Sequence, residues 1–184
     1  MSHRPRPMRI LLAFDKFKDA LSAREACAIV AGALGAAHDN WQFDLCPLTD
    51  GGEGLGEILT TAVGGTLRCA RVAGPRGELV TARFGLVAFG NIPLPARTML
   101  DLPGVLAEAP IAVVEMAQAS GLMLLQRASR DPWQTSTFGT GQLIRTAVEM
   151  GARGLLLGVG GSATHDLGLG ALAALGLEFR TADG

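Results

Sequence analysis

Apolar runs that end in polar, glycine-rich loops recur along this chain, and they constrain its fold more than any other feature. Residues 10–14 are the first such run, followed by charged residues and then by a stretch with helical periodicity. This pattern is typical of a buried parallel strand and its following helix. Later strands are predicted at 43–48, 111–116 and 154–159, and later helices at 55–63, 139–150 and 166–175. The alternation predicts an α/β fold with mostly parallel sheets and flanking helices.

Two pairs of residues mark where helices begin. Ser22 and Glu25 form a capping box, in which the hydroxyl and the carboxylate accept backbone N–H groups that the first helical turn leaves without partners. Asp50 and Glu53 have the same spacing, with glycine between them, and predict a second capping box.

The middle of the chain changes character. Residues 66–72 and 78–87 alternate apolar and polar side chains, and turn residues at 74–77 separate them, so we expect an antiparallel pair. Residues 88–110 contain four prolines and little periodicity, which indicates an insertion or a crossing between two lobes.

These observations predict two lobes. Residues 1–7 form a disordered lead, 8–74 the N-terminal part of a first, Rossmann-like α/β lobe, and 75–184 a second α/β lobe with the insertion near 88–110. Residues 178–180 begin a further strand shortly before the sequence stops. We therefore expect the second lobe to be truncated at its C-terminus.

The composition narrows the class of partner. The net charge is −1 and no basic run occurs, which argues against nucleic acid and against an anionic membrane surface. No apolar run approaches the roughly 18 residues that a membrane span needs. The three cysteines form no CxxC pair, which fits a reducing cytoplasm. We expect a cytoplasmic protein that binds a small molecule.

Four small, polar loops hold the candidate chemistry. They span 15–18, 49–54, 135–141 and 160–166, and each runs into a predicted helix. In open α/β sheets ligands bind beyond the carboxyl ends of the strands. Glycines let a backbone approach a phosphate closely, and helix N-termini offer free N–H donors, so these loops suit anions. Asp50, Glu53 and Asp166 would supply carboxylates to hold Mg²⁺ or to accept a hydroxyl proton, and Lys18 would neutralise charge on a transferring phosphoryl group. These are the residue types that a kinase needs.

Simpler interpretations exist for the same residues. Capping alone explains Asp50 and Glu53, and Ser162 or Thr164 could be helix caps. Residues 158–163 match the dinucleotide fingerprint G-x-G-x-x-A, with an acidic residue about twenty positions on, which alone would suggest NAD binding. The Walker A motif is absent from the sequence.

Several motifs together resemble the glycerate kinase family, which phosphorylates D-glycerate with ATP. In the family's order they are DKFKDALS at 15–22, LTDGGEG at 48–54, EMAQASGL at 115–122, STFGTGQL at 136–143 and GGSATHDLG at 160–168. The resemblance runs from about residue 8 to the last residue. Departures are small: Thr137 stands where Ser often precedes the aromatic residue, His165 stands where Asn is common, and Leu167 replaces a frequent Gly.

The resemblance implies a two-lobed enzyme that uses ATP and Mg²⁺, has its site between the lobes and is about twice as long as this chain. It implies Lys18, Asp50 and Asp166 as catalytic residues and Glu53 as a Mg²⁺ ligand. It also implies the following substrate- and phosphate-binding residues: Asp15, Ser22, Gly51, Gly52, Gly139, Thr140, Gly141, Gly160, Gly161, Ser162 and Thr164. The expected product is a phosphoglycerate, with 2-phosphoglycerate preferred over 3-phosphoglycerate.

Two alternatives stay open beside a glycerate kinase. One is an NAD-binding oxidoreductase fragment, and the other is a non-catalytic, truncated kinase remnant. Formation of a homodimer is also open.

Overall fold

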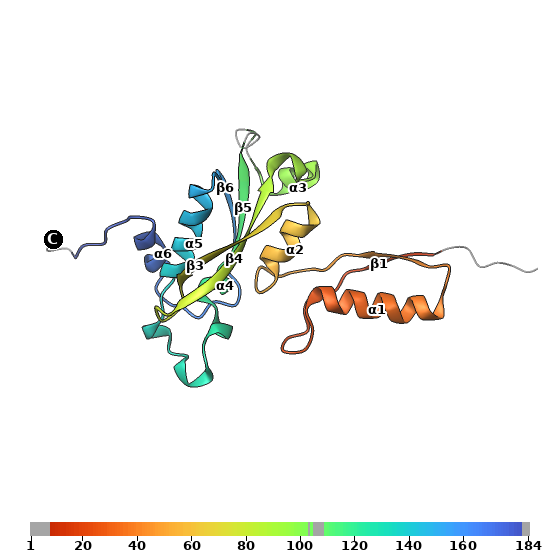
Figure 1. Ribbon diagram of the computed structural model, residues 1–184, viewed down its shortest axis with the longest axis horizontal. Helices are drawn as coiled ribbons and strands as arrows, with labels where there is room; N and C mark the ends of the chain where they lie inside the picture. Colours follow the sequence, from red (N-terminus) through yellow and green to blue (C-terminus); the bar gives the residue numbers. More distant parts are fainter. Residues whose placement is uncertain (1–7, 103, 105–108, 182–184) are drawn as a thin grey trace, which may run out of the picture. The chain divides into compact units, whose positions relative to one another are not determined.

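The computed structural model describes residues 8–102, 104 and 109–181. The chain divides into two compact units, Met1–Asp50 and Gly51–Gly184 (Figure 1). The predicted boundary between residues 74 and 75 falls inside the second unit, between two strands that pair with each other. The predicted lead, residues 1–7, lies outside the described residues. None of the helices in the described ranges is long and apolar enough to cross a membrane.

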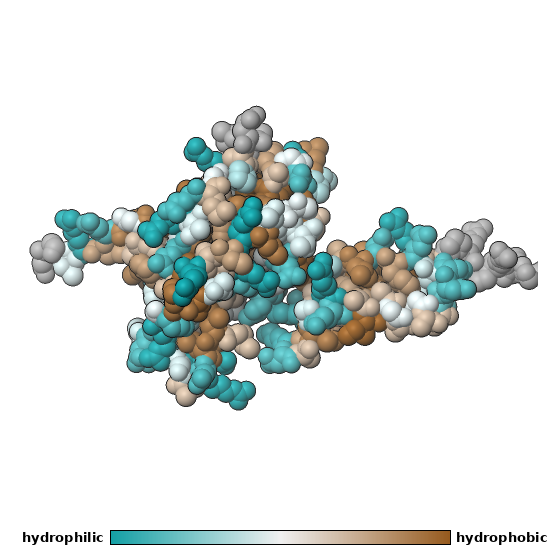
Figure 2. Space-filling view, viewed as in Figure 1, coloured by the Kyte–Doolittle hydropathy of each residue, from teal (hydrophilic) through white to brown (hydrophobic). Residues whose placement is uncertain are grey.

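The first unit is one strand-helix-strand motif. Its elements are β1 (Arg9–Leu12), α1 (Ala23–Ala37) and β2 (Gln42–Leu45), and the two strands pair in parallel. The predicted capping box is confirmed, because the Ser22 Oγ accepts the Glu25 N–H while the Glu25 carboxylate accepts the Ser22 N–H at 2.8 Å. Leu11 and Leu45 are exposed, and Figure 2 shows hydrophobic surface on this unit.

The second unit is built on a four-stranded sheet in the order β3-β4-β5-β6. Its strands are β3 (Thr66–Ala73), β4 (Leu79–Ala88), β5 (Pro110–Glu115) and β6 (Gly154–Gly158), and its helices are α2 (Leu55–Ala62), α3 (Leu94–Met99), α4 (Ala117–Ser120), α5 (Phe138–Glu149) and α6 (Leu169–Ala174). Short 3₁₀ turns lie at Phe89–Asn91, Leu122–Leu124, Arg127–Ser129 and Pro132–Gln134. The α/β class is confirmed, and so is the predicted antiparallel hairpin of β3 and β4. β5 pairs antiparallel with β4 and parallel with β6.

Helices cover both faces of this sheet (Figure 1). On one face, Phe84 and Val114 pack with Leu143 of α5 in the largest core cluster. On the other face, Val87 and Val113 pack with Leu55, the first residue of α2. The period-2 alternation along β4 and β5 therefore supplies two hydrophobic cores, one to each helical layer.

Three local predictions are corrected. Helix α2 begins at Leu55, and its N-cap residue is Gly54, which has a left-handed backbone with φ of 99°. Because the N-cap is Gly54 and no side chain caps it from that position, Asp50 and Glu53 do not form its capping box. Helix α6 begins at Leu169 instead of 166, again behind a left-handed glycine. Residues 178–180 form no strand, since they pair with no strand among the described residues. Within the predicted insertion, residues 89–91 and 94–99 form a 3₁₀ turn and α3, which connect neighbouring strands of one sheet.

Candidate functional site

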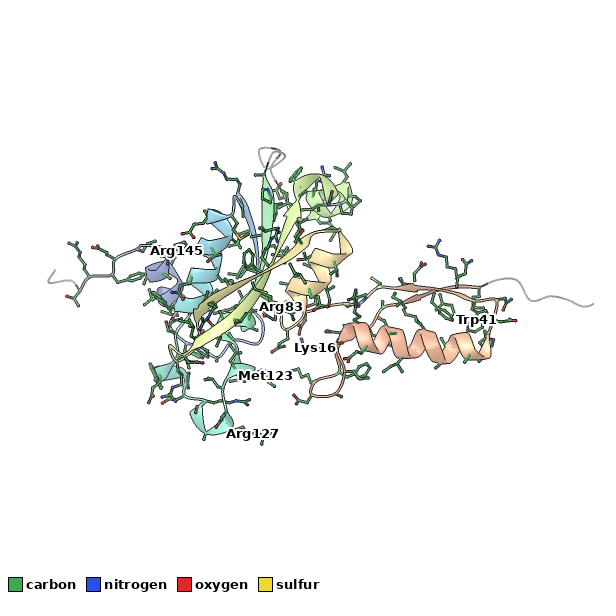
Figure 3. All side chains as sticks on the ribbon, viewed as in Figure 1. Lys16, Trp41, Arg83, Met123, Arg127 and Arg145 are labelled. Atoms are coloured by element: carbon green, nitrogen blue, oxygen red, sulfur yellow. The ribbon has the colours of Figure 1, made fainter. Side chains whose placement is uncertain are left out.

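The structure sorts the predicted site residues into one set for each unit. Asp15, Lys18, Ser22 and Asp50 belong to the first unit, and the remaining predicted residues belong to the second. In the first unit, Asp50 is paired with Lys16, whose Nζ lies 3.0 Å from the Asp50 carboxylate (Figure 3). Lys18 is exposed and the Ser22 hydroxyl serves the helix cap. Lys16, which the prediction did not include, is therefore the cation beside Asp50.

In the second unit, two glycine motifs about a hundred residues apart interlock. The Gly160 N–H donates to the carbonyl oxygen of Gly51 at 3.0 Å. A Cβ on Gly160 would lie 2.7 Å from the Cα of Gly52, and one on Gly161 would collide with the carboxylate of Glu53. Gly160 has no room for a side chain because the obstacle is backbone, and Gly161 favours glycine because its φ is 69°. The predicted residues 51–53 and 160–161 are thus brought together.

A buried carboxylate that the site prediction missed holds this arrangement. Glu115, at the end of β5, is 2 % exposed and accepts the N–H groups of Gly54 at 3.0 Å and Gly56 at 3.2 Å. It thereby caps helix α2 from another element. Burial raises the pKa of Glu115, the hydrogen bonds from Gly56, Gln118 and Gly54 oppose that rise, and the charge of Glu53 adds to it. A lone carboxylate ending an apolar strand was the signal for this residue.

The raised pKa of Glu115 gives a testable pH dependence. The native state holds this proton at pH values where the unfolded chain has released it, so the free energy of unfolding falls as pH rises from the ordinary value of 4.5 through the native pKa. We expect Glu115→Gln to remove this fall, measured by urea unfolding over that range. Glu149→Gln, at an exposed carboxylate on α5, is the matched control. Equal pH slopes in the Glu115→Gln variant and the unmodified protein would contradict the assignment.

Asp166 joins the loop before α5 to the start of α6. Its Oδ2 accepts the N–H of Thr137 at 2.7 Å, the hydroxyls of Thr137 and Ser136 at 2.9 and 3.2 Å, and the N–H of Gly170 at 3.2 Å. Its Oδ1 accepts the N–H of Gly168 at 3.2 Å. Burial acts to raise the pKa of Asp166, but the hydrogen bonds outweigh burial and hold that pKa below its ordinary value. Through these contacts Asp166 holds the loop before α5 and the start of α6 together. Its catalytic role stays a prediction.

The glycine-threonine-glycine segment at the start of α5 is packed inside the unit. Gly139 lies against the backbone of Ala73, and Gly141 lies against the backbone of Ala171. The Thr140 hydroxyl shares a hydrogen bond of 2.7 Å with the Ser120 hydroxyl. Their direct contact with a ligand stays a prediction, since all three residues are buried.

Two hollows open on the second unit. The larger, of about 380 Å³, is lined by Arg83, Met123 and three carboxylates, those of Glu53, Glu57 and Glu115. Arg83 and Met123 are labelled in Figure 3. The smaller, of about 280 Å³, is lined by Arg130, Ser162, Thr164 and His165 with apolar neighbours. The phosphate-binding residues predicted at 162 and 164 therefore share a hollow with an arginine.

The dinucleotide fingerprint does not have its required context. Strand β6 ends at Gly158, but the next helix, α6, begins only at Leu169. In NAD-binding units the helix opens within the motif, so that its N-terminus meets the pyrophosphate. The structure therefore argues against the NAD-binding alternative.

Comparisons with known proteins agree on one family. The sequence model of the glycerate kinase family matches residues 10–184. The glycerate kinase of Halalkalibacterium halodurans is 35% identical over 175 residues, which are 95% of this chain and 41% of that protein. The glycerate 2-kinase of Escherichia coli is 37% identical over 177 residues, or 96% of this chain and 42% of that protein. The chain thus spans about two fifths of the length of these relatives.

A solved structure gives the same result for the fold. A crystal structure described as that of a glycerate kinase 2 from Salmonella typhimurium LT2 superposes with a TM-score of 0.69 at 38% identity. The superposition covers 97% of this chain and 42% of the crystallised one.

Proposed function

The chain belongs to the glycerate kinase family, and we propose that the protein it forms transfers a phosphoryl group from ATP to D-glycerate. The observation that carries the proposal is the interlocking of residues 51–53 with residues 160–161, which brings two of the family's motifs to one place. Backbone crowded with glycine is suited to close approach by phosphate oxygens.

The proposed step is a direct displacement. A hydroxyl oxygen of glycerate forms a bond to the γ-phosphorus while the bond from that phosphorus to the bridging oxygen breaks. ADP leaves with the electron pair, and the hydroxyl proton passes to a base. Catalysis of this step needs positioning and charge neutralisation. We assign Asp50, whose carboxylate lies 3.0 Å from the Lys16 Nζ, to the substrate hydroxyl. Asp166, which accepts five hydrogen bonds from the protein, is assigned to positioning the loops around it. Lys18, with Lys16 beside Asp50, would neutralise the transferring phosphoryl group.

The residues near the proposed phosphate loop suit a Mg²⁺ ion that enters bound to ATP. Among the described residues no group of three or more His, Cys, Asp and Glu is arranged to hold a metal. Mg²⁺ at ATP sites needs only one or two carboxylates, since phosphate oxygens and waters complete its shell. The Glu53 carboxylate lies where a side chain on Gly161 would stand, beside the proposed phosphate loop. Glu53 would hold the ion, which supplies charge neutralisation when bound.

We propose 2-phosphoglycerate as the product, which the name of the Escherichia coli relative, glycerate 2-kinase, supports. We also propose a cytoplasmic location, since the described part of the chain has no membrane-spanning helix and the relatives are bacterial glycerate kinases. We propose a homodimer as well.

The test is an ADP-release assay with D-glycerate and MgATP, in which each substrate is omitted in turn and the product is identified by mass and by its hydrolysis pattern. We expect ADP only when both substrates are present. Asp50→Asn and Lys18→Ala should each lower kcat/KM at least about tenfold, because both act on the transferring group. ADP formed without glycerate, or the absence of phosphoglycerate from a protein that binds ATP, would refute the proposed reaction. The second result would favour the non-catalytic alternative.

A further inference from the structure

The smaller hollow of the second unit gathers polar groups that carry positive or no charge at neutral pH. Its side chains are Arg130, Ser162, Thr164 and His165, together with Leu122, Pro132 and Ala163. Among the residues that the structure describes, no carboxylate lines it, whereas three line the larger hollow of the same unit. A free oxyanion therefore fits the smaller hollow better than the larger one, where a cation such as Mg²⁺ would have to stand between the carboxylates and an anion.

The hydroxyl groups on the two loops at 135–137 and 162–164 divide into two kinds. Those of Thr135, Ser136 and Thr137 make hydrogen bonds inside the protein, to the carbonyl oxygen of Ala163 or to Asp166. The side chains of Ser162 and Thr164 make none with any residue that the structure describes. Ser162 and Thr164, which line the hollow, thus carry the hydroxyls still able to donate to a ligand.

The backbone that carries these hydroxyls is held at several points. The Ala163 N–H donates to Ser120 at 2.9 Å, and the Leu122 N–H donates to Gly161 at 2.8 Å. The Ala163 carbonyl accepts the Thr135 hydroxyl at 2.8 Å. Donors on a fixed backbone bind an anion at a smaller entropy cost than donors on a mobile loop.

Arg130 supplies the charge. Its Nε donates to the carbonyl oxygen of Leu125 at 3.4 Å, which leaves both terminal nitrogens of the guanidinium available. Within the described ranges, no ion pair involves Arg130. A guanidinium presents a planar fork that matches two oxygens of one oxyanion.

We propose that Arg130, Ser162 and Thr164 form an oxyanion-binding site, with Arg130 as its charged anchor, that takes either a phosphoryl group of the nucleotide or the carboxylate of the sugar acid. The proposal rests on the proposed function for the identity of these two sources. The binding of an oxyanion at this place does not depend on turnover.

The experiment measures binding of sodium pyrophosphate and of D-glycerate by calorimetry, with the unmodified chain and with variants whose fold is checked by circular dichroism. We expect Arg130→Gln to weaken binding of one of the two probes at least about tenfold, which is the loss typical of a charge-assisted pair. Arg127→Gln is the matched control, since Arg127 lies three residues away on an exposed 3₁₀ turn (Figure 3). It should change the affinity for that probe less than twofold. Arg130→Lys should restore part of the affinity, and Ser162→Ala with Thr164→Ala should weaken it without changing the charge.

The outcomes separate the two sources and the two proposals. Loss of pyrophosphate binding identifies the phosphoryl group as the ligand, and loss of D-glycerate binding identifies the carboxylate. Equal losses in Arg130→Gln and Arg127→Gln, or no binding of either probe to the unmodified chain, would overturn the site. Glycerate-dependent ADP release with unchanged KM values in Arg130→Gln would overturn the site and leave the kinase proposal intact. Arg130-dependent binding without any glycerate-dependent ADP release would support the site and overturn the kinase proposal.

Discussion

Substitution of alanine for Gly139 is expected to lower the free energy of unfolding of the second unit by about 3 kcal/mol, the upper part of the range for overpacked cores. The added Cβ would overlap the carbonyl oxygen of Ala73 on β3 and lie 2.8 Å from its carbonyl carbon. Both obstacles are backbone, so α5 must move away from the sheet. That movement would break the hydrogen bond from the Ala73 N–H to the Gln142 side chain and loosen the core around Leu143.

Urea unfolding followed by circular dichroism measures this effect. The control is Gly90→Ala in the same unit, where a Cβ would meet nothing within 4 Å. Its effect should stay within about 0.5 kcal/mol, as for most surface substitutions. Similar midpoints for the two variants would mean that α5 and β3 are not packed as described.

Replacement of Asp166 by asparagine is expected to cost about 2–4 kcal/mol of unfolding free energy, since hydrogen bonds to a charged acceptor contribute about 1.5–3 kcal/mol each. Asparagine can place one oxygen at the four donors that meet Oδ2, but its amide nitrogen would then face the N–H of Gly168. The loop at 135–138 and the start of α6 should loosen together, because Asp166 is their shared acceptor.

The same carboxylate predicts a dependence on acid. The pKa of Asp166 is held below its ordinary value of 3.8, so its contribution to stability is complete above that value and is lost as pH falls through the native pKa. The Asp166→Asn variant should lack this acid-sensitive part. Asp131→Asn is the matched control, because asparagine can replace aspartate in accepting the Trp133 N–H. An unchanged acid slope in Asp166→Asn would show that Asp166 is not the ionised acceptor.

Features encoded by neighbouring residues were predictable. The capping box of Ser22 and Glu25 and the hairpin around residues 74–77 depend on side chains a few positions apart, and both are confirmed. The alternation of apolar runs with helical stretches was also sufficient for the α/β class. Each of these signals acts within one element or one turn, so no knowledge of the tertiary structure was needed.

Contacts between distant segments were not predictable. The spacing of Asp50 and Glu53 matches a capping box, yet Glu115, about sixty residues away, caps α2 instead. Two lysines stand near each other after β1, and only the course of the backbone brings Lys16 to Asp50. Nothing in the local sequence around Arg130 links it to Ser162.

The sequence by itself determined the α/β class, the positions of most strands and longer helices, the hairpin turn and the family motifs, because these arise from local preferences and from short patterns of residues. The tertiary structure decided which carboxylates are occupied by the protein's own N–H groups, which glycines are crowded by another backbone and which polar groups face a hollow. The physical reason is that hydrogen-bond satisfaction and exclusion of side chains depend on atoms a few ångströms apart in space, whatever their separation along the chain.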